Sequence, residues 1–149
     1  MNPWQAILAA VQVDSSSDAV LDQATRLALL SGAELDLIHV FETPGYGGPQ
    51  ALVPVAGKVE LAGLEPWRSA KTMAGLMNDL IAKGVRVGRG HLVMGIVEDR
   101  LGHFTRQRPY DLLIIGNHSP SRLERMLSGD LVGHLVNHAS CPVLVVPHH

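Results

Sequence analysis

Two runs of consecutive apolar residues, LLII at 112–115 and VLVV at 143–146, constrain the fold of this chain most strongly. A strand that is apolar at every position, and not only at alternate positions, is typical of a parallel sheet with helices packed on both faces. Similar apolar runs lie at 5–13 and 34–41, and the segments between the runs carry apolar residues at helical spacing. Strands that alternate with helices in this way predict βαβ units.

The alternation also predicts where each element lies. We expect strands at 5–13, 34–41, 85–95, 111–116 and 141–147, and helices at 67–83, 96–106 and 130–140. A further helix is expected between a cap at Ser15, Ser16 or Ser17 and a stop at Gly32. The Gly- and Pro-rich stretch 42–66 is expected to be a long excursion with a loose helical turn at 53–61.

Because crossovers between parallel strands are right-handed, these elements have one simplest arrangement. It is a single five-stranded parallel sheet in the order 3-2-1-4-5, doubly wound and Rossmann-like, with helices on both faces. A chain of 149 residues is long enough for one full core, so we expect this α/β fold to form one domain over 1–149.

Composition and charge exclude several classes of function. The net charge of -2 offers no clustered basic surface for nucleic acid, and no apolar run is long enough to span a membrane. The single cysteine, Cys141, excludes an intrachain disulfide and fits a reducing compartment. The first residues also lack the basic stretch of a secretion signal, so we expect a cytoplasmic protein.

The order of the strands places a candidate ligand site. In an open α/β sheet ligands bind beyond the carboxyl ends of the strands, where the strand order reverses, which here is between strands one and four. We therefore expect a crevice beside Val11, Gln12 and Gly116. Gly129 precedes the last helix, whose N-terminus could hold an anion. His118, in the loop between, fits a phosphate contact and a simple polar loop position equally well.

Other motifs give no catalytic or metal site. GYGG at 45–48 lacks the strand-turn-helix setting of a dinucleotide fingerprint, and no P-loop or GxSxG motif is present. His134 and His138 have the spacing of two metal ligands on a helix, but no third ligand accompanies them. His39 lies inside an apolar strand and is expected to be buried with a hydrogen-bond partner. We expect neither an enzyme nor a metal centre.

In the combined order of these motifs, the chain resembles the universal stress proteins. The resemblance covers ILAAV near the start, LIHV closing the second strand, Gly95 in LVMG, DLLIIG, and the loop that leads into CPVLVV. It implies a five-stranded parallel α/β fold that pairs through its last strand. It also implies membership of a family that divides into ATP-binding and non-binding groups.

The ATP-binding group follows the pattern G-x2-G-x9-G-[ST]. Gly116 and Gly129 match its first and third glycines, whereas Ser119 stands at the second and Asp130 at the hydroxyl position. The family's aspartate after strand one, which contacts adenosine, corresponds to Gln12. The spacing of a nucleotide site is therefore kept, while three of its chemically specific positions differ.

Asp130 is the departure with the largest physical consequence. A carboxylate about 5 Å from a phosphate costs roughly 3 kcal/mol per phosphate charge at an effective dielectric of about 20. That repulsion weakens triphosphate binding by about two orders of magnitude. Adenosine or a monophosphate is affected less, with its base against Val11 and Val40 and its phosphate near Gly116 and Asn117.

Two functions remain open at this point. The first is a non-catalytic, dimeric stress-response module with a partly degenerate adenine-nucleotide pocket. The second is a genuine ATP- or AMP-binding switch, in which slow ATP hydrolysis could occur. The candidate nucleotide-binding residues are Val11, Gln12, Val40, Gly95, Gly116, Asn117, His118, Ser119, Gly129 and Asp130.

The last strand is also a candidate interface. In the expected order it forms one edge of the sheet, and an apolar edge without charge is a template for pairing with another chain. Pro142 and Pro147 limit the pairing to the residues between them, which favours a discrete two-fold dimer. The predicted homodimer contacts are Val143, Leu144, Val145 and Val146.

Overall fold

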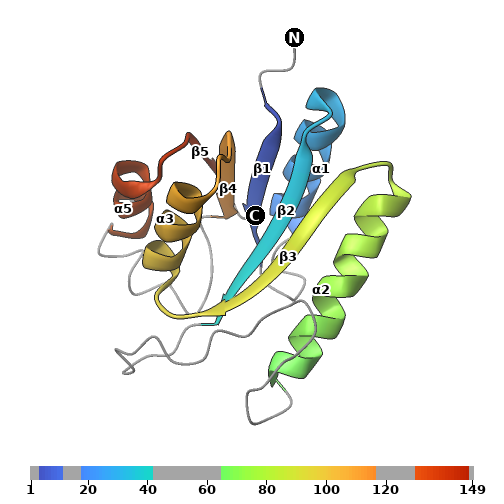
Figure 1. Ribbon diagram of the computed structural model, residues 1–149, viewed down its shortest axis with the longest axis horizontal. Coiled ribbons are helices and arrows are strands. Elements are labelled where there is room, and N and C mark those ends of the chain that lie inside the picture. The colour runs from blue at the N-terminus through green and yellow to red at the C-terminus, as the bar shows by residue number, and fades with distance from the viewer. Residues whose placement is uncertain (1–3, 12–17, 42–64, 117–129, 148–149) are drawn as a thin grey trace.

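The computed structural model describes residues 4–11, 18–41, 65–116 and 130–147 (Figure 1). Its elements are β1 (Ala6–Ala10), α1 (Asp18–Ser31), β2 (Glu34–Phe41), α2 (Glu65–Ala82), β3 (Arg86–Met94), α3 (Val97–Gln107), β4 (Leu112–Gly116), α5 (Asp130–His138) and β5 (Val143–Val146). These bounds agree with the expected ones to within a few residues. The helical turn expected at 53–61 lies outside the described residues.

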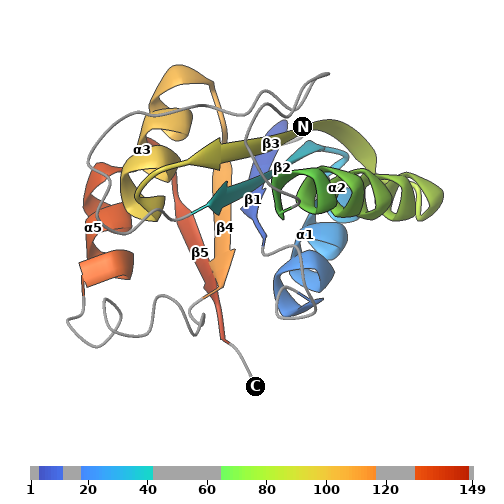
Figure 2. The same ribbon diagram turned by 90° about the horizontal axis from the view of Figure 1, so that it is seen from below.

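All five strands form one sheet in the order β3-β2-β1-β4-β5, and every pair is parallel. The fold predicted from the sequence is therefore confirmed. Helices α1 and α2 cover one face and α3 and α5 the other (Figure 2). The carboxyl ends of the strands lie along one side of the sheet, which we call the carboxyl edge. Their amino ends lie along the opposite side, the amino-terminal edge.

The core consists of two apolar layers, one on each face of the sheet. Alternate residues of a strand enter opposite layers, so Ile7 and Ala9 pack beneath α1 and α2 while Leu8 packs beneath α3 and α5. Strand β4 is buried at Leu112 through Ile115, as its unbroken apolar run requires. Because helices cover both faces of the sheet, ligands have access to side chains at the carboxyl and amino-terminal ends of the strands.

His39 is buried, as expected, with 8% of its surface exposed. Its Nδ1 lies 2.9 Å from the carbonyl oxygen of Val11, and its ring packs edge-on against Phe41. A ring nitrogen that faces a carbonyl oxygen must carry a proton, which fixes the tautomer of the neutral ring. His39 therefore joins the ends of β1 and β2.

Strand β3 carries an irregularity that the sequence did not indicate. Leu35 pairs with Val87 and Leu37 with Gly90, so Gly88 and Arg89 together face the single residue Asp36. The extra backbone N–H, that of Arg89, donates to Oδ1 of Asp36 at 2.8 Å. A Cβ atom at Gly88 would overlap that same oxygen, so glycine makes the approach of the carboxylate possible.

Candidate functional site

The carboxyl edge of the sheet holds the described part of the predicted nucleotide site. Four of the candidate residues lie there: Val11, Val40, Gly95 and Gly116. Asp130 is the first residue of α5, although the structure does not describe its side chain. The candidates Gln12, Asn117, His118, Ser119 and Gly129 lie outside the described residues.

Val11 and Val40 lie at the ends of neighbouring strands but pack on different faces of the sheet. Val11 belongs to the layer beneath α1 and α2 and is only 3% exposed, whereas Val40 packs half-buried against the layer beneath α3 and α5. The backbone of Val11 is engaged as well, because its N–H donates to the Ile38 carbonyl at 2.8 Å. Of the two valines, Val40 therefore offers the larger accessible surface to a ligand.

Gly95 and Gly116 are required for different reasons. Gly95 has a φ of 140°, a conformation that favours glycine, and its N–H donates to the Phe41 carbonyl at 3.0 Å. At Gly116 an added Cβ would lie 3.1 Å from a methyl group of Val20, so glycine lets α1 pack closely on the end of β4. Both glycines therefore shape the carboxyl edge through the backbone.

Arg100 is a cation at this edge that the sequence analysis missed. It lies in the first turns of α3, and a Cβ at Gly95 would lie 3.0 Å from its Cδ, so its side chain lies over that glycine. Its Nε is buried and has no hydrogen-bond partner among the described residues. From the sequence alone, Arg100 is one arginine of an amphipathic helix. Its position over Gly95 follows only from the packing of α3 on the end of β3.

The N-terminus of α3 is an unfavourable place for a bound anion. Glu98 and Asp99 lie in its first turn, where carboxylates stabilise the helix dipole. Their charges would repel a phosphate at that helix end. The N-terminus of α5 carries one acidic residue at its start, Asp130, so the same repulsion is expected there.

Strand β5 forms the edge of the sheet that the sequence predicted. Within the described residues its hydrogen-bonding partner is β4 alone. Val143 and Val145 pack toward the layer beneath α3 and α5, whereas Leu144 faces the other way and is 36% exposed. Val136 of α5 is 59% exposed, so exposed apolar surface also lies on the helix that precedes this strand.

Cys141 is half-buried, and burial, with a smaller contribution from Asp111, raises the pKa of its thiol, which favours the unreactive protonated form. Among the described residues, no three His, Cys, Asp or Glu side chains gather as metal ligands would. None of the described helices is both long and apolar enough to cross a membrane.

A family model and two relatives of known sequence give the same assignment. The family model described as universal stress protein family matches residues 3–147. Universal stress protein A homolog 1 of Coxiella burnetii is 27% identical over 146 residues, which is 96% of each chain. A second relative, universal stress protein MJ0531 of Methanocaldococcus jannaschii, is 27% identical over 130 residues, covering 83% of this chain and 70% of the relative.

Solved structures share the fold. The universal stress protein from Archaeoglobus fulgidus in complex with dAMP has a TM-score of 0.62 and 19% identity, covering 96% of this chain and 98% of that one. A universal stress protein in complex with cAMP has a TM-score of 0.66 and 19% identity, covering 96% of both chains. With the family model matching nearly its whole length, this chain belongs to the universal stress protein family.

Proposed function

We propose that this protein is a non-catalytic, dimeric stress-response module that holds adenosine or an adenosine monophosphate, in preference to ATP, at the carboxyl edge of its sheet. The observation that carries the proposal is the position of Asp130 as the first residue of α5. A carboxylate there can accept the free N–H groups of the first helical turn, which are the groups that would otherwise bind a phosphate.

Two further observations support a ligand with few phosphate charges. The solved relatives in complex with dAMP and cAMP hold nucleotides that carry a single phosphate. In this chain the first and third glycines of the nucleotide pattern are kept at Gly116 and Gly129, so the spacing of the loop matches while its charge differs. The proposal assigns no catalytic residue, and the free thiol of Cys141 fits a cytoplasmic location.

Arg100 favours the second candidate, a genuine nucleotide-gated switch that binds ATP. A guanidinium group over Gly95, whose buried Nε has no partner in the described part of the chain, supplies a positive charge close to the candidate crevice. Such a charge would offset part of the repulsion from Asp130. The two candidates differ in one measurable quantity, which is the affinity for ATP relative to that for AMP.

Calorimetry on purified, nucleotide-free protein tests the proposal. Titrations with adenosine, AMP and ATP should show binding of adenosine and AMP, with ATP weaker than AMP by about tenfold or more, because each added phosphate charge meets the Asp130 carboxylate. Magnesium-free and magnesium-loaded ATP are compared, since the metal screens the phosphates. ATP that binds as tightly as AMP under both conditions would establish the switch instead.

We expect the dimer to form through β5. Its outer backbone groups have no strand partner within the described residues, and a second copy can pair with them about a two-fold axis. Leu144, the exposed apolar side chain of the strand, would then be covered. Pro142 and Pro147 flank the strand and stop the pairing from extending.

Leu144→Lys should convert the dimer to a monomer, because a pair of lysines related by the two-fold axis would repel each other across the interface. Leu30→Lys is the matched control, since Leu30 is an apolar residue of α1 that is 85% exposed. Sedimentation velocity at tens of micromolar should give a dimer for the wild type and for Leu30→Lys. A monomeric wild type would remove dimerisation from the proposal and leave nucleotide binding untouched.

A further inference from the structure

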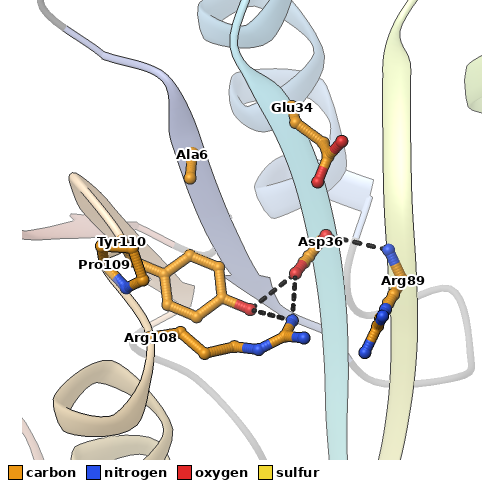
Figure 3. Close-up of a pocket in the computed structure, with 7 residues that line it drawn as sticks. All are labelled: Ala6, Glu34, Asp36, Arg89, Arg108, Pro109 and Tyr110. Carbon is orange, nitrogen blue, oxygen red and sulfur yellow. Dashed lines mark hydrogen bonds and ion pairs between the residues drawn. The ribbon is translucent and has the colours of Figure 1, made fainter.

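The amino-terminal edge of the sheet carries a pocket of about 350 Å³, opposite the carboxyl ends of the strands (Figure 3). Glu34 and Asp36 come from the start of β2, Arg89 from the irregular part of β3, and Arg108 from the segment between α3 and β4. Pockets of this size accept small molecules. Every lining residue lies outside the candidate nucleotide site, so a ligand here would be a second and independent one.

One guanidinium group in the pocket is held in place. Nη1 of Arg108 lies 3.2 Å from Oδ2 of Asp36 and 3.4 Å from the hydroxyl oxygen of Tyr110. The Tyr110 hydroxyl donates to the same Asp36 oxygen at 2.6 Å. Both contacts of Arg108 use Nη1, and its side chain remains 35% exposed, so Nε and Nη2 stay available to a ligand. A pre-positioned donor fork of this kind matches a carboxylate.

A second guanidinium group is not engaged by the protein. Arg89 is fixed through its backbone N–H, which donates to Asp36, while its side chain makes no hydrogen bond or ion pair with the described residues. In Figure 3 the side chains of Arg89 and Arg108 extend to the same side of Asp36, and Glu34 lies on the other side. The pocket therefore has a cationic end with free donors.

The remaining charges decide which anion fits. Asp36 is 4% exposed and already accepts three hydrogen bonds, so its charge is matched by Arg108 and by the dipoles around it. Glu34 lies at the other end and would repel a dianion such as phosphate more than a monoanion. The walls contributed by Ala6, Pro109 and the Tyr110 ring are apolar.

We propose that this pocket binds a small organic monocarboxylate with an apolar or planar body. The carboxylate would accept from the free N–H groups of Arg89 and Arg108, and the body would lie against Pro109 and the Tyr110 ring. Bidentate pairing gives the carboxylate its orientation, and the apolar wall gives the site its preference over inorganic anions.

Benzoate is the test probe, titrated into 15N-labelled protein and followed by amide chemical shifts. We expect saturable shifts in the low-millimolar range, centred on the amides of Glu34, Arg89 and Tyr110. Arg89→Gln should weaken benzoate binding by about tenfold or more, because it removes charge-assisted hydrogen bonds. The variant keeps the backbone N–H that donates to Asp36, so its fold should persist.

Arg86→Gln is the matched control, because Arg86 lies on the same strand and donates to the Gly32 carbonyl at 3.0 Å. It removes the same charge from the lining of a neighbouring pocket and should leave benzoate affinity within about twofold. The proposal is overturned if benzoate gives no saturable shift, if both arginine variants weaken it equally, or if benzylamine or inorganic phosphate binds more tightly.

Discussion

Replacing Asp36 by asparagine should lower the free energy of unfolding by about 2 to 3 kcal/mol at neutral pH. The carboxylate is buried and accepts hydrogen bonds from Tyr110, Arg108 and the Arg89 amide. An asparagine amide would direct two N–H donors at groups that are themselves donors, and it would leave Arg108 without its counter-charge. The estimate lies below the cost of breaking a fully buried pair because Arg108 is 35% exposed.

The loss of stability caused by Asp36→Asn should become smaller as the pH falls. Burial alone would raise the pKa of Asp36, but the His91 ring, whose Nε2 lies 3.8 Å from Oδ2, and hydrogen bonds from Tyr110 and the Arg89 amide outweigh it and hold the pKa below its ordinary value. A carboxyl group whose pKa is lower in the folded state contributes stability above its unfolded pKa of about 3.9, and loses it as the pH falls through the folded value. The difference between wild type and Asp36→Asn should therefore be constant near neutrality and shrink in acid.

Urea unfolding from pH 7 down to about pH 2 measures this difference, with Asp22→Asn as the control. Asp22 is an exposed residue of α1, so its replacement should change stability by less than about 0.5 kcal/mol. Equal losses for the two variants at pH 7 would show that the Asp36 contacts contribute little. A difference that stays constant in acid would show that the pKa of Asp36 is not lowered on folding.

Asp130→Ser should tighten ATP binding by about two orders of magnitude, because it removes a negative charge from the helix N-terminus where the phosphates would lie. AMP, with less phosphate charge, should gain less than ATP, and adenosine should hardly change. This gradation across the three ligands separates a charge effect from a general change in the shape of the pocket. Calorimetry on the nucleotide-free variant measures all three affinities.

Asp79→Ser is the control for this second prediction, since it changes the net charge equally from an exposed position near the C-terminal end of α2. It should leave all three affinities unchanged apart from a small screened term. If Asp130→Ser leaves ATP affinity unchanged as well, the carboxylate is no barrier and the nucleotide-gated switch becomes the better description of the protein.

The sequence by itself determined the architecture, and from it we predict the edge of the sheet at which a nucleotide would bind. Unbroken apolar runs such as LLII and VLVV report burial on both faces, and helical periodicity between them leaves few topologies once crossovers are right-handed. β2 was predicted over the same residues, 34–41, that it occupies. The candidate residues were expected at one edge because parallel strands bring their carboxyl ends together there.

Only the tertiary structure decided which charged side chains meet. Asp36 lies in the strand ELDLIHVF, where its position could equally be a solvent-facing one, and its partners Arg89, Arg108 and Tyr110 are 53, 72 and 74 residues away. Contacts over such separations depend on strand order and on the irregular pairing at Gly88, which local patterns do not encode. The position of Arg100 over Gly95 could not be predicted either, because it depends on how α3 packs on the sheet.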